Sequence, residues 1–153
     1  MDKKLEHAKE LIDFIYESPS VFHVVDNVNK KLTQFGYLQL KESDKWNLVK
    51  GGKYFVEKNG SALIAFVVGE KSVCSDGFKI IAAHTDSPTF KVKPLPEIKV
   101  EGEYLKLNTE VYGGPILNTW FDRPLSIAGR VTVKSSNSFH PISKLINIKR
   151  SEE

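Results

Sequence analysis

The residues of this chain best suited to chemistry are His84 and Asp86, which stand two positions apart where a short apolar run ends. Side chains two apart in an extended strand lie on the same face, so this spacing lets the imidazole and the carboxylate meet. A carboxylate that accepts the second N–H of an imidazole fixes its tautomer and raises the basicity of the nitrogen that faces a metal. The pair therefore indicates a metal ligand, His84, oriented by Asp86.

A second interpretation of the same residues needs no metal. His-x-Asp is a short pattern, and a histidine that merely ends a strand is often followed by an aspartate that caps the next turn, which Pro88 favours at this point. The nine residues from Ile80 to Pro88 leave both interpretations open.

The elements that position this pair are predicted to be strands. Four apolar residues, Ile80 to Ala83, lie between Gly77 and the Ser87-Pro88 break, and at this length they favour a central buried strand over residues 78–83 rather than a helix. Two strand-like runs precede it, Tyr54–Lys58 and residues 61–68, and Asn59-Gly60 between them is a strong two-residue hairpin signal. An antiparallel pair and then a buried strand are therefore expected before His84.

The first 36 residues predict two helices. In the first, apolar residues repeat at three- and four-residue spacing, with charged residues elsewhere around the wheel: Leu5, Ala8, Leu11, Ile12 and Ile15. Ser20 can cap the second helix, and Gly36 ends it. His7 and His23 lie on these helices without a suitable partner four residues away, so both are expected to be structural.

The remaining segments complete a sheet. Residues 69–77 predict a surface loop, and residues 90–112 alternate as strands do, with interruptions at two prolines. Another strand is expected over residues 125–133, then a polar loop containing His140, and then one weakly amphipathic stretch over 144–150. The fold class is α/β, with two N-terminal helices followed by a mixed β-sheet.

A glycine-glycine-proline turn precedes a dense packet of aromatic and charged side chains. The residues of interest in it are Gly113, Gly114, Trp120, Asp122 and Arg123. An Asp-Arg pair beside two aromatic rings can brace the wall of a pocket, and it can equally form a salt bridge that organises a loop. The local pattern does not choose between these.

Composition excludes several classes of function. The 153 residues carry 22 Lys and Arg against 19 Asp and Glu, and the basic residues are scattered, which argues against nucleic acid or an anionic membrane as partner. A single cysteine excludes an intrachain disulfide and cysteine-rich zinc motifs, as expected of a cytoplasmic protein. No apolar segment approaches the ~20 residues of a membrane span.

Three blocks of sequence resemble the aspartyl aminopeptidase family of zinc metallopeptidases. They are FIYESPSVFHVV, HTDSPTFKVKP and EVYGGPILNTWFDRPLSIAGRV, in the order of that family. The resemblance implies a two-zinc exopeptidase that removes N-terminal residues from peptides and assembles into large homo-oligomers, although other divalent metals remain possible. It also implies an α/β catalytic domain interrupted by a smaller inserted domain, which predicts a catalytic portion at 1–129 and the start of the insertion at 130–153.

By position in these motifs, His84 matches the first zinc ligand and Asp86 the carboxylate that orients it. The family's other ligands and its glutamate base have no match in this chain. Asp122 resembles a bridging aspartate of a related aminopeptidase group, but its block in the matched family favours a role, shared with Arg123, in shaping a pocket or an interface. Gly113 and Gly114 fit that block, whereas Pro115 stands where relatives often carry another glycine.

A catalytic zinc takes three protein ligands and keeps an open position, so this chain alone is expected to be inactive. Two alternatives remain. The chain can be a non-catalytic fragment that associates with other subunits through exposed sheet edges, or it can complete a small metal site through Asp122 or His140.

Overall fold

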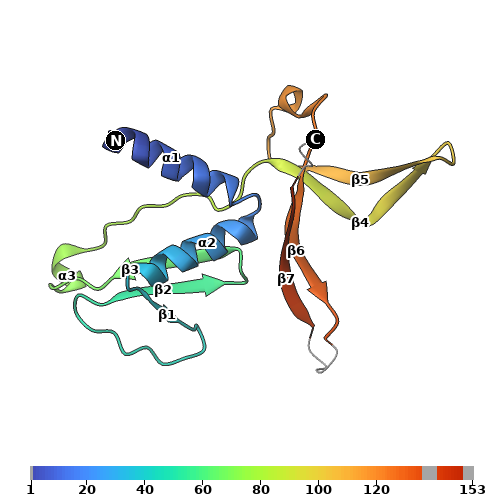
Figure 1. The fold of residues 1–153 in the computed structure, drawn as a ribbon. Helices are drawn as coiled ribbons and strands as arrows, with labels where there is room; N and C mark the ends of the chain where they lie inside the picture. The colour runs from blue at the N-terminus through green and yellow to red at the C-terminus, as the bar shows by residue number, and fades with distance from the viewer. Residues whose placement is uncertain (1, 136–140, 150–153) are drawn as a thin grey trace. The chain divides into compact units, whose positions relative to one another are not determined.

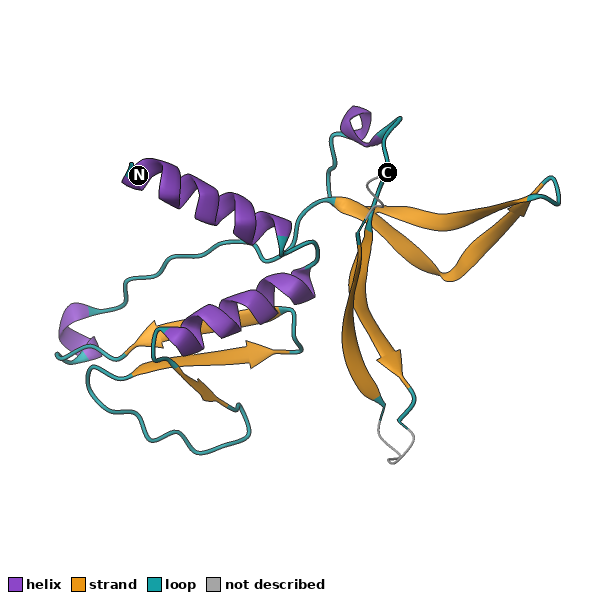
Figure 2. Ribbon diagram, in the orientation of Figure 1, coloured by secondary structure: helices purple, strands orange, loops and turns teal. Residues whose placement is uncertain are grey.

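The computed structural model describes residues 2–135 and 141–149, so His140 lies outside the described residues. The chain divides into two compact units, residues 1–86 with 126–153 and residues 87–125, and each is described by itself. Figures 1 and 2 show the helices and strands of both. No helix of the described residues is long and apolar enough to cross a membrane.

Both predicted helices are confirmed as α1 (Lys3–Tyr16) and α2 (Val21–Gln34). Ser20 is the N-cap residue of α2 by backbone conformation, but its side chain makes no capping bond; its Oγ lies 2.7 Å from Nδ1 of His23. Partial burial lowers the pKa of His23, with Lys30 adding to the effect and Asp26 opposing it. This histidine therefore has a structural partner on its own helix.

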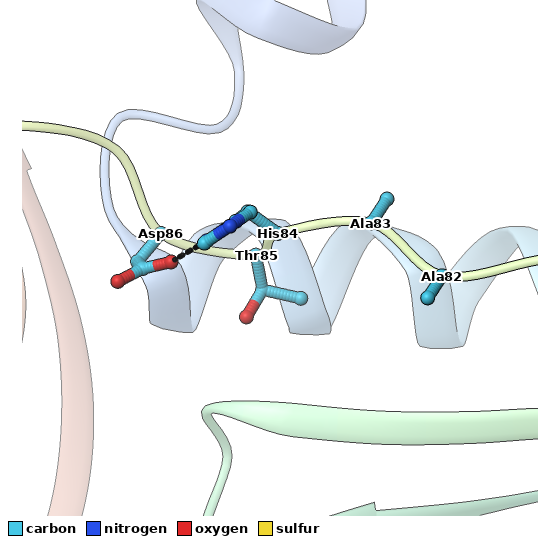
Figure 3. Close-up of a pocket in the computed structure, with 5 residues that line it drawn as sticks. All are labelled: Ala82, Ala83, His84, Thr85 and Asp86. Carbon is cyan, nitrogen blue, oxygen red and sulfur yellow. Dashed lines mark hydrogen bonds and ion pairs between the residues drawn. The ribbon is translucent and has the colours of Figure 1, made fainter.

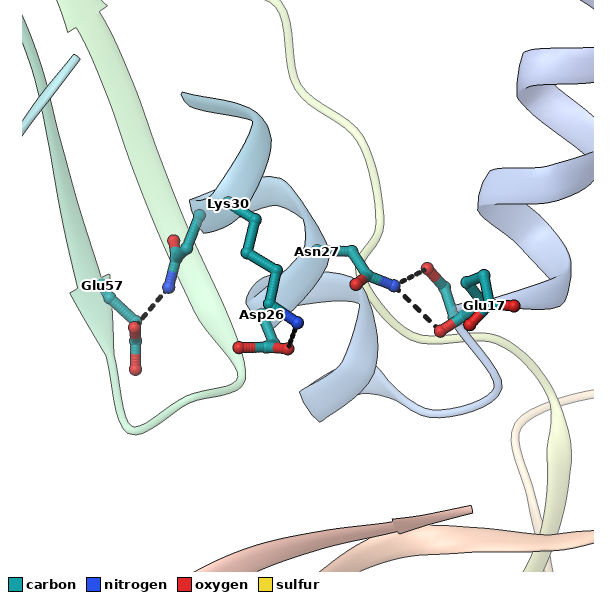
Figure 4. A network of polar contacts seen from close by, with 7 residues as sticks. Glu17, Asp26, Asn27, Lys30 and Glu57 are labelled. Carbon is teal, nitrogen blue, oxygen red and sulfur yellow. Dashed lines mark hydrogen bonds and ion pairs between the residues drawn. The ribbon is translucent and has the colours of Figure 1, made fainter. Parts of the chain in front are cut away.

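The junction between α1 and α2 is held by polar contacts (Figure 4). Nδ2 of Asn27 on α2 donates to the backbone carbonyl of Glu17 at 2.8 Å and to Oγ of Ser18 at 3.1 Å. One turn further along, Lys30 pairs with Asp26 at 2.6 Å. The two bonds of Asn27 tie α2 to the end of α1 across the turn that contains Pro19, whereas the Lys30–Asp26 pair lies within α2.

A mixed three-stranded sheet follows, as predicted, in the order β1 (Leu38–Leu40), β2 (Lys53–Lys58) and β3 (Ala62–Val67). Strand β1 runs parallel to β2, and β2 pairs antiparallel with β3. Asn59 and Gly60 both adopt positive φ, 54° and 68°, as a type I′ hairpin turn requires. The hairpin predicted from these two residues is confirmed.

The buried core of the described residues consists of Val25, Tyr54 and Phe55. Tyr54 packs on one face of the sheet, where its ring centroid lies 5.7 Å from that of Phe66 on β3. Phe55 must point to the other face, because successive strand residues alternate. Glu57 shares that face and accepts a 2.5 Å hydrogen bond from Asn29 on α2, so α2 covers the Phe55 side.

The prediction of a central buried strand over residues 78–83 is wrong for this structure. The segment belongs to no helix or strand, and Phe78, Ile80 and Ile81 are 78%, 82% and 100% exposed. A strand exists only through hydrogen bonds to neighbouring strands, and no described strand pairs with this one. The preceding surface loop contains one short helix, α3 (Val73–Asp76).

The first unit is completed by β6 (Ile127–Val133) and β7 (Ile142–Ile148), which pair antiparallel. The strand predicted over 125–133 is therefore confirmed. The sequence predicted only a weakly amphipathic stretch over residues 144–150. Most of that stretch belongs to β7, because its residues pair across the ladder with those of β6, as Ile148 does with Ile127.

In the second unit, β4 (Thr89–Val100) pairs antiparallel with β5 (Tyr104–Tyr112). The two prolines do not end β4, because both lie where the pairing register shifts, between Val92 and Glu97. A bulge of this kind frees proline from donating to the ladder. The unit ends with a 3₁₀ turn, η1 (Leu117–Trp120).

Candidate metal-binding site

The structure brings His84 and Asp86 together. Nδ1 of His84 lies 2.9 Å from Oδ1 of Asp86, and Figure 3 shows the two side chains directed toward each other from one extended segment. The side chain of His84 is 90% exposed and that of Asp86 is 39% exposed. The contact predicted from a spacing of two residues is thus present without a surrounding strand ladder.

This contact determines which nitrogen of His84 can bind a metal. With Asp86 ionised, its carboxylate only accepts hydrogen bonds, so the tautomer of His84 that satisfies this contact is the one with the proton on Nδ1. Nε2 then keeps its lone pair, and because the ring is exposed, that lone pair is accessible. Such a carboxylate-bonded imidazole is the usual state of a metal-binding histidine.

The surroundings of the pair are open. A surface hollow is lined by Ala82, Ala83, His84, Thr85 and Asp86, all from one segment (Figure 3). No group of three or more His, Cys, Asp and Glu side chains that could hold a metal occurs in residues 2–135 and 141–149. The donor set fits one ligand position with its orienting carboxylate, and a catalytic zinc site needs two further protein ligands.

Thr85 has a contact that the sequence did not reveal. Its Oγ1 donates a 2.9 Å hydrogen bond to the backbone carbonyl of Ser61, beside the turn between β2 and β3. Alternation along the segment could have indicated that Thr85 points away from its two neighbours, but not what it meets. The partner is a backbone carbonyl 24 residues away, and no pattern of side chains in the sequence indicates such a partner.

The predicted pocket residues all belong to the second unit, residues 87–125. Trp120 packs edge-on against Phe90, with ring centroids 5.0 Å apart. Gly113 has a φ of 75°, and a Cβ at this position would lie 3.4 Å from Cα of Pro88. A side chain at Gly114 would meet nothing within 4 Å. Gly113 is thus the glycine that backbone conformation requires.

Asp122 and Arg123 do not form a salt bridge with each other, which was one of the two arrangements that the sequence left open. Nη1 of Arg123 donates instead to the backbone carbonyl of Thr119 at 3.2 Å, which braces the turn of η1. Asp122 is exposed and adopts a φ of 52°. Among the described residues it joins no cluster of metal-binding side chains, so a small metal site built on Asp122 has no support in that part of the chain.

Residues 14–151 match the family model described as aminopeptidase I zinc metalloprotease, M18. A probable M18 family aminopeptidase 2 of Clostridium acetobutylicum is 63% identical over 150 residues, which make up 98% of this chain and 35% of that protein. An aspartyl aminopeptidase of Dictyostelium discoideum is 44% identical, with 98% of this chain and 31% of that protein covered.

The fold agrees with these sequence matches. A solved structure of the S. cerevisiae mApe1 dodecamer superposes with a TM-score of 0.83 at 32% identity, covering 92% of this chain and 33% of that one. This chain therefore spans about a third of the length of the relatives it matches.

Proposed function

This chain belongs to the M18 family of zinc metalloprotease aminopeptidases, and on that premise we propose that its site serves the removal of N-terminal residues from peptides. The observation that carries the proposal is the 2.9 Å contact between Nδ1 of His84 and Asp86, which leaves Nε2 able to bind zinc. Zinc, when bound, polarises the scissile carbonyl and lowers the pKa of bound water. His84 supplies one ligand, and Asp86 fixes its tautomer and orientation.

We assign the remaining parts of the site to polypeptide beyond these 153 residues. The described residues offer one secure zinc ligand, whereas a catalytic zinc needs three protein ligands. We therefore propose that this chain by itself has no hydrolytic activity. Residues 1–129 form the N-terminal part of the catalytic domain, and residues 130–153 begin an inserted domain. The exposed apolar segment 78–83 is then covered by the rest of that catalytic domain.

The whole protein is proposed to be a cytoplasmic homo-oligomer that acts on peptides and binds neither nucleic acid nor membrane. Its similarity to an enzyme solved as a dodecamer supports the oligomer. Within the second unit, the pocket or interface residues are the following five: Gly113, Gly114, Trp120, Asp122 and Arg123. The proposed complete site holds two metal ions, with zinc as the native metal.

Replacing Asp86 by asparagine is expected to weaken zinc binding by the complete gene product by roughly tenfold or more, as changes to carboxylates that support a metal-binding histidine do. The amide keeps the size of the side chain but not the charge that favours a protonated Nδ1. Competition with a chelator of known affinity measures the change. Asp76→Asn is the matched control, because Asp76 is an exposed carboxylate 3.8 Å from Lys71; equal affinities in both variants would contradict the role of Asp86.

An alternative function, association of a non-catalytic fragment with other subunits, is favoured by a separate observation. Large apolar side chains of the described residues are exposed, among them Phe78, Ile80 and Ile81. Such surface favours contact with another chain. The 153-residue chain is then expected to sediment as an assembly, and a single species with the mass of one chain would contradict this alternative.

A further inference from the structure

We propose that Thr85 is a positioning residue for the metal-binding pair, and that the turn between β2 and β3 is the support against which it acts. This inference rests on the proposed function, because it assigns a role toward the zinc that His84 would bind. Thr85 touches neither the metal position nor a substrate in this view. It acts by holding the backbone from which His84 and Asp86 project.

The side chain of Thr85 points away from the side chains of its two neighbours, His84 and Asp86. His84 and Asp86 are exposed and meet each other, whereas Thr85 is half-buried and donates to the carbonyl of Ser61 at 2.9 Å. In extended backbone, the middle of three residues points away from the other two. The hydrogen bond of Thr85 therefore orients both members of the pair at once, since a rotation of this backbone would turn all three side chains.

The backbone that leads to the pair has little other support. No backbone hydrogen bond of the described residues involves residues 78–84, and the apolar side chains of that segment are exposed. A segment that has neither ladder hydrogen bonds nor buried side chains depends for its position on the few side-chain hydrogen bonds near it, such as that of Thr85. The hydroxyl bond of Thr85 to the Ser61 carbonyl is therefore a contact that connects this part of the segment to the sheet.

The turn that provides this carbonyl is itself braced. Nη1 of Arg130 on β6 donates to the carbonyl of Asn59 at 2.6 Å, and the same guanidinium lies 4.2 Å from the ring centroid of Phe22 on α2. Gly60 in this turn has a φ of 68°, a conformation that favours glycine, and a Cβ there would be in ordinary contact with Nη1 of Arg130 at 3.4 Å. Two elements of the first unit, β6 and α2, therefore brace the turn to which Thr85 is bonded.

The experiment compares Thr85→Val, which keeps the shape and removes the hydroxyl, with Thr85→Ser, which keeps the hydroxyl. In the complete gene product, Thr85→Val is expected to lower zinc affinity by about tenfold, in the range seen when groups outside the ligand set are changed. Thr85→Ser is expected to keep the affinity of the unaltered protein. Chelator competition measures the affinity, and circular dichroism checks that each variant is folded; Thr85→Ala replaces the valine variant if that one fails to fold.

A second readout needs no metal. Nitrogen chemical shifts of the His84 ring report its tautomer, which is expected to be the Nδ1-protonated form in the unaltered protein and in Thr85→Ser. In Thr85→Val a mixture of tautomers is expected, because the ring no longer meets Asp86 in a fixed geometry. Unchanged zinc affinity or an unchanged tautomer in a folded Thr85→Val variant would overturn the inference, and so would a loss that serine does not rescue.

The failure of this inference differs from the failure of the proposed function. If His84→Ala leaves zinc binding intact, the proposed metal site is wrong, and the positioning role is overturned with it. If His84→Ala removes zinc while Thr85→Val does not weaken it, only the positioning role of Thr85 is overturned.

Discussion

His84→Ala is expected to lower the zinc affinity of the complete gene product by more than roughly 100-fold, since changes to groups outside the ligand set already cost 10–100-fold. Nearly all aminopeptidase turnover should be lost with it. The reason is that alanine removes Nε2, the one donor of this segment that the contact with Asp86 leaves ready to bind zinc. Metal analysis of the purified protein and the rate on an N-terminal aminoacyl substrate measure the two effects.

The matched control for this variant is His7→Ala. His7 is also an exposed histidine with a carboxylate partner, Glu10, at 3.6 Å, but it lies on α1 and is assigned no metal. The control should bind zinc and turn over substrate as the unaltered protein does. Unchanged zinc content and rate in His84→Ala would remove the basis of the proposed function.

Phe55→Ala is expected to destabilise the first unit by about 3–5 kcal/mol, the usual cost of replacing a fully buried phenylalanine by alanine. Phe55 is 1% exposed and lies on the face of the sheet that α2 covers. Few other buried side chains in the described residues could share the loss. Urea unfolding of the 153-residue chain, followed by circular dichroism, measures the change in the free energy of unfolding.

Ile64→Ala on the neighbouring strand is the control for this substitution. Ile64 is 71% exposed, so its replacement should change the free energy of unfolding by no more than about 0.5 kcal/mol. Equal destabilisation by both variants would show that the packing between α2 and the sheet is not what stabilises the unit.

Elements that depend on local signals were predictable from the sequence. The two helices follow from apolar spacing, and the hairpin follows from Asn59-Gly60, because these residues adopt positive φ at low cost. Within the site, the contact between His84 and Asp86 is equally local, since only one residue separates them. Each of these features is decided by neighbours within a few positions along the chain.

Elements that depend on distant partners were predicted less well. The run at residues 78–83 has the composition of a buried strand, but burial requires neighbouring strands, and the described residues supply none. Residues 142–148 became β7 because β6 offers a pairing edge, which their own weak pattern did not indicate. An apolar composition makes a segment suitable for burial. Whether the segment is buried depends on the strands and helices that pack against it.

The sequence by itself determined the types and the spacing of the chemical groups, a histidine and a carboxylate able to meet, and the three blocks that identify the family. Only the tertiary structure showed what holds them: Thr85 bonded to Ser61, and Arg130 bonded to Asn59 across 71 positions. Both acceptors are backbone carbonyls, which every residue type carries. A sequence pattern therefore cannot mark them, and chain folding alone brings them to their donors.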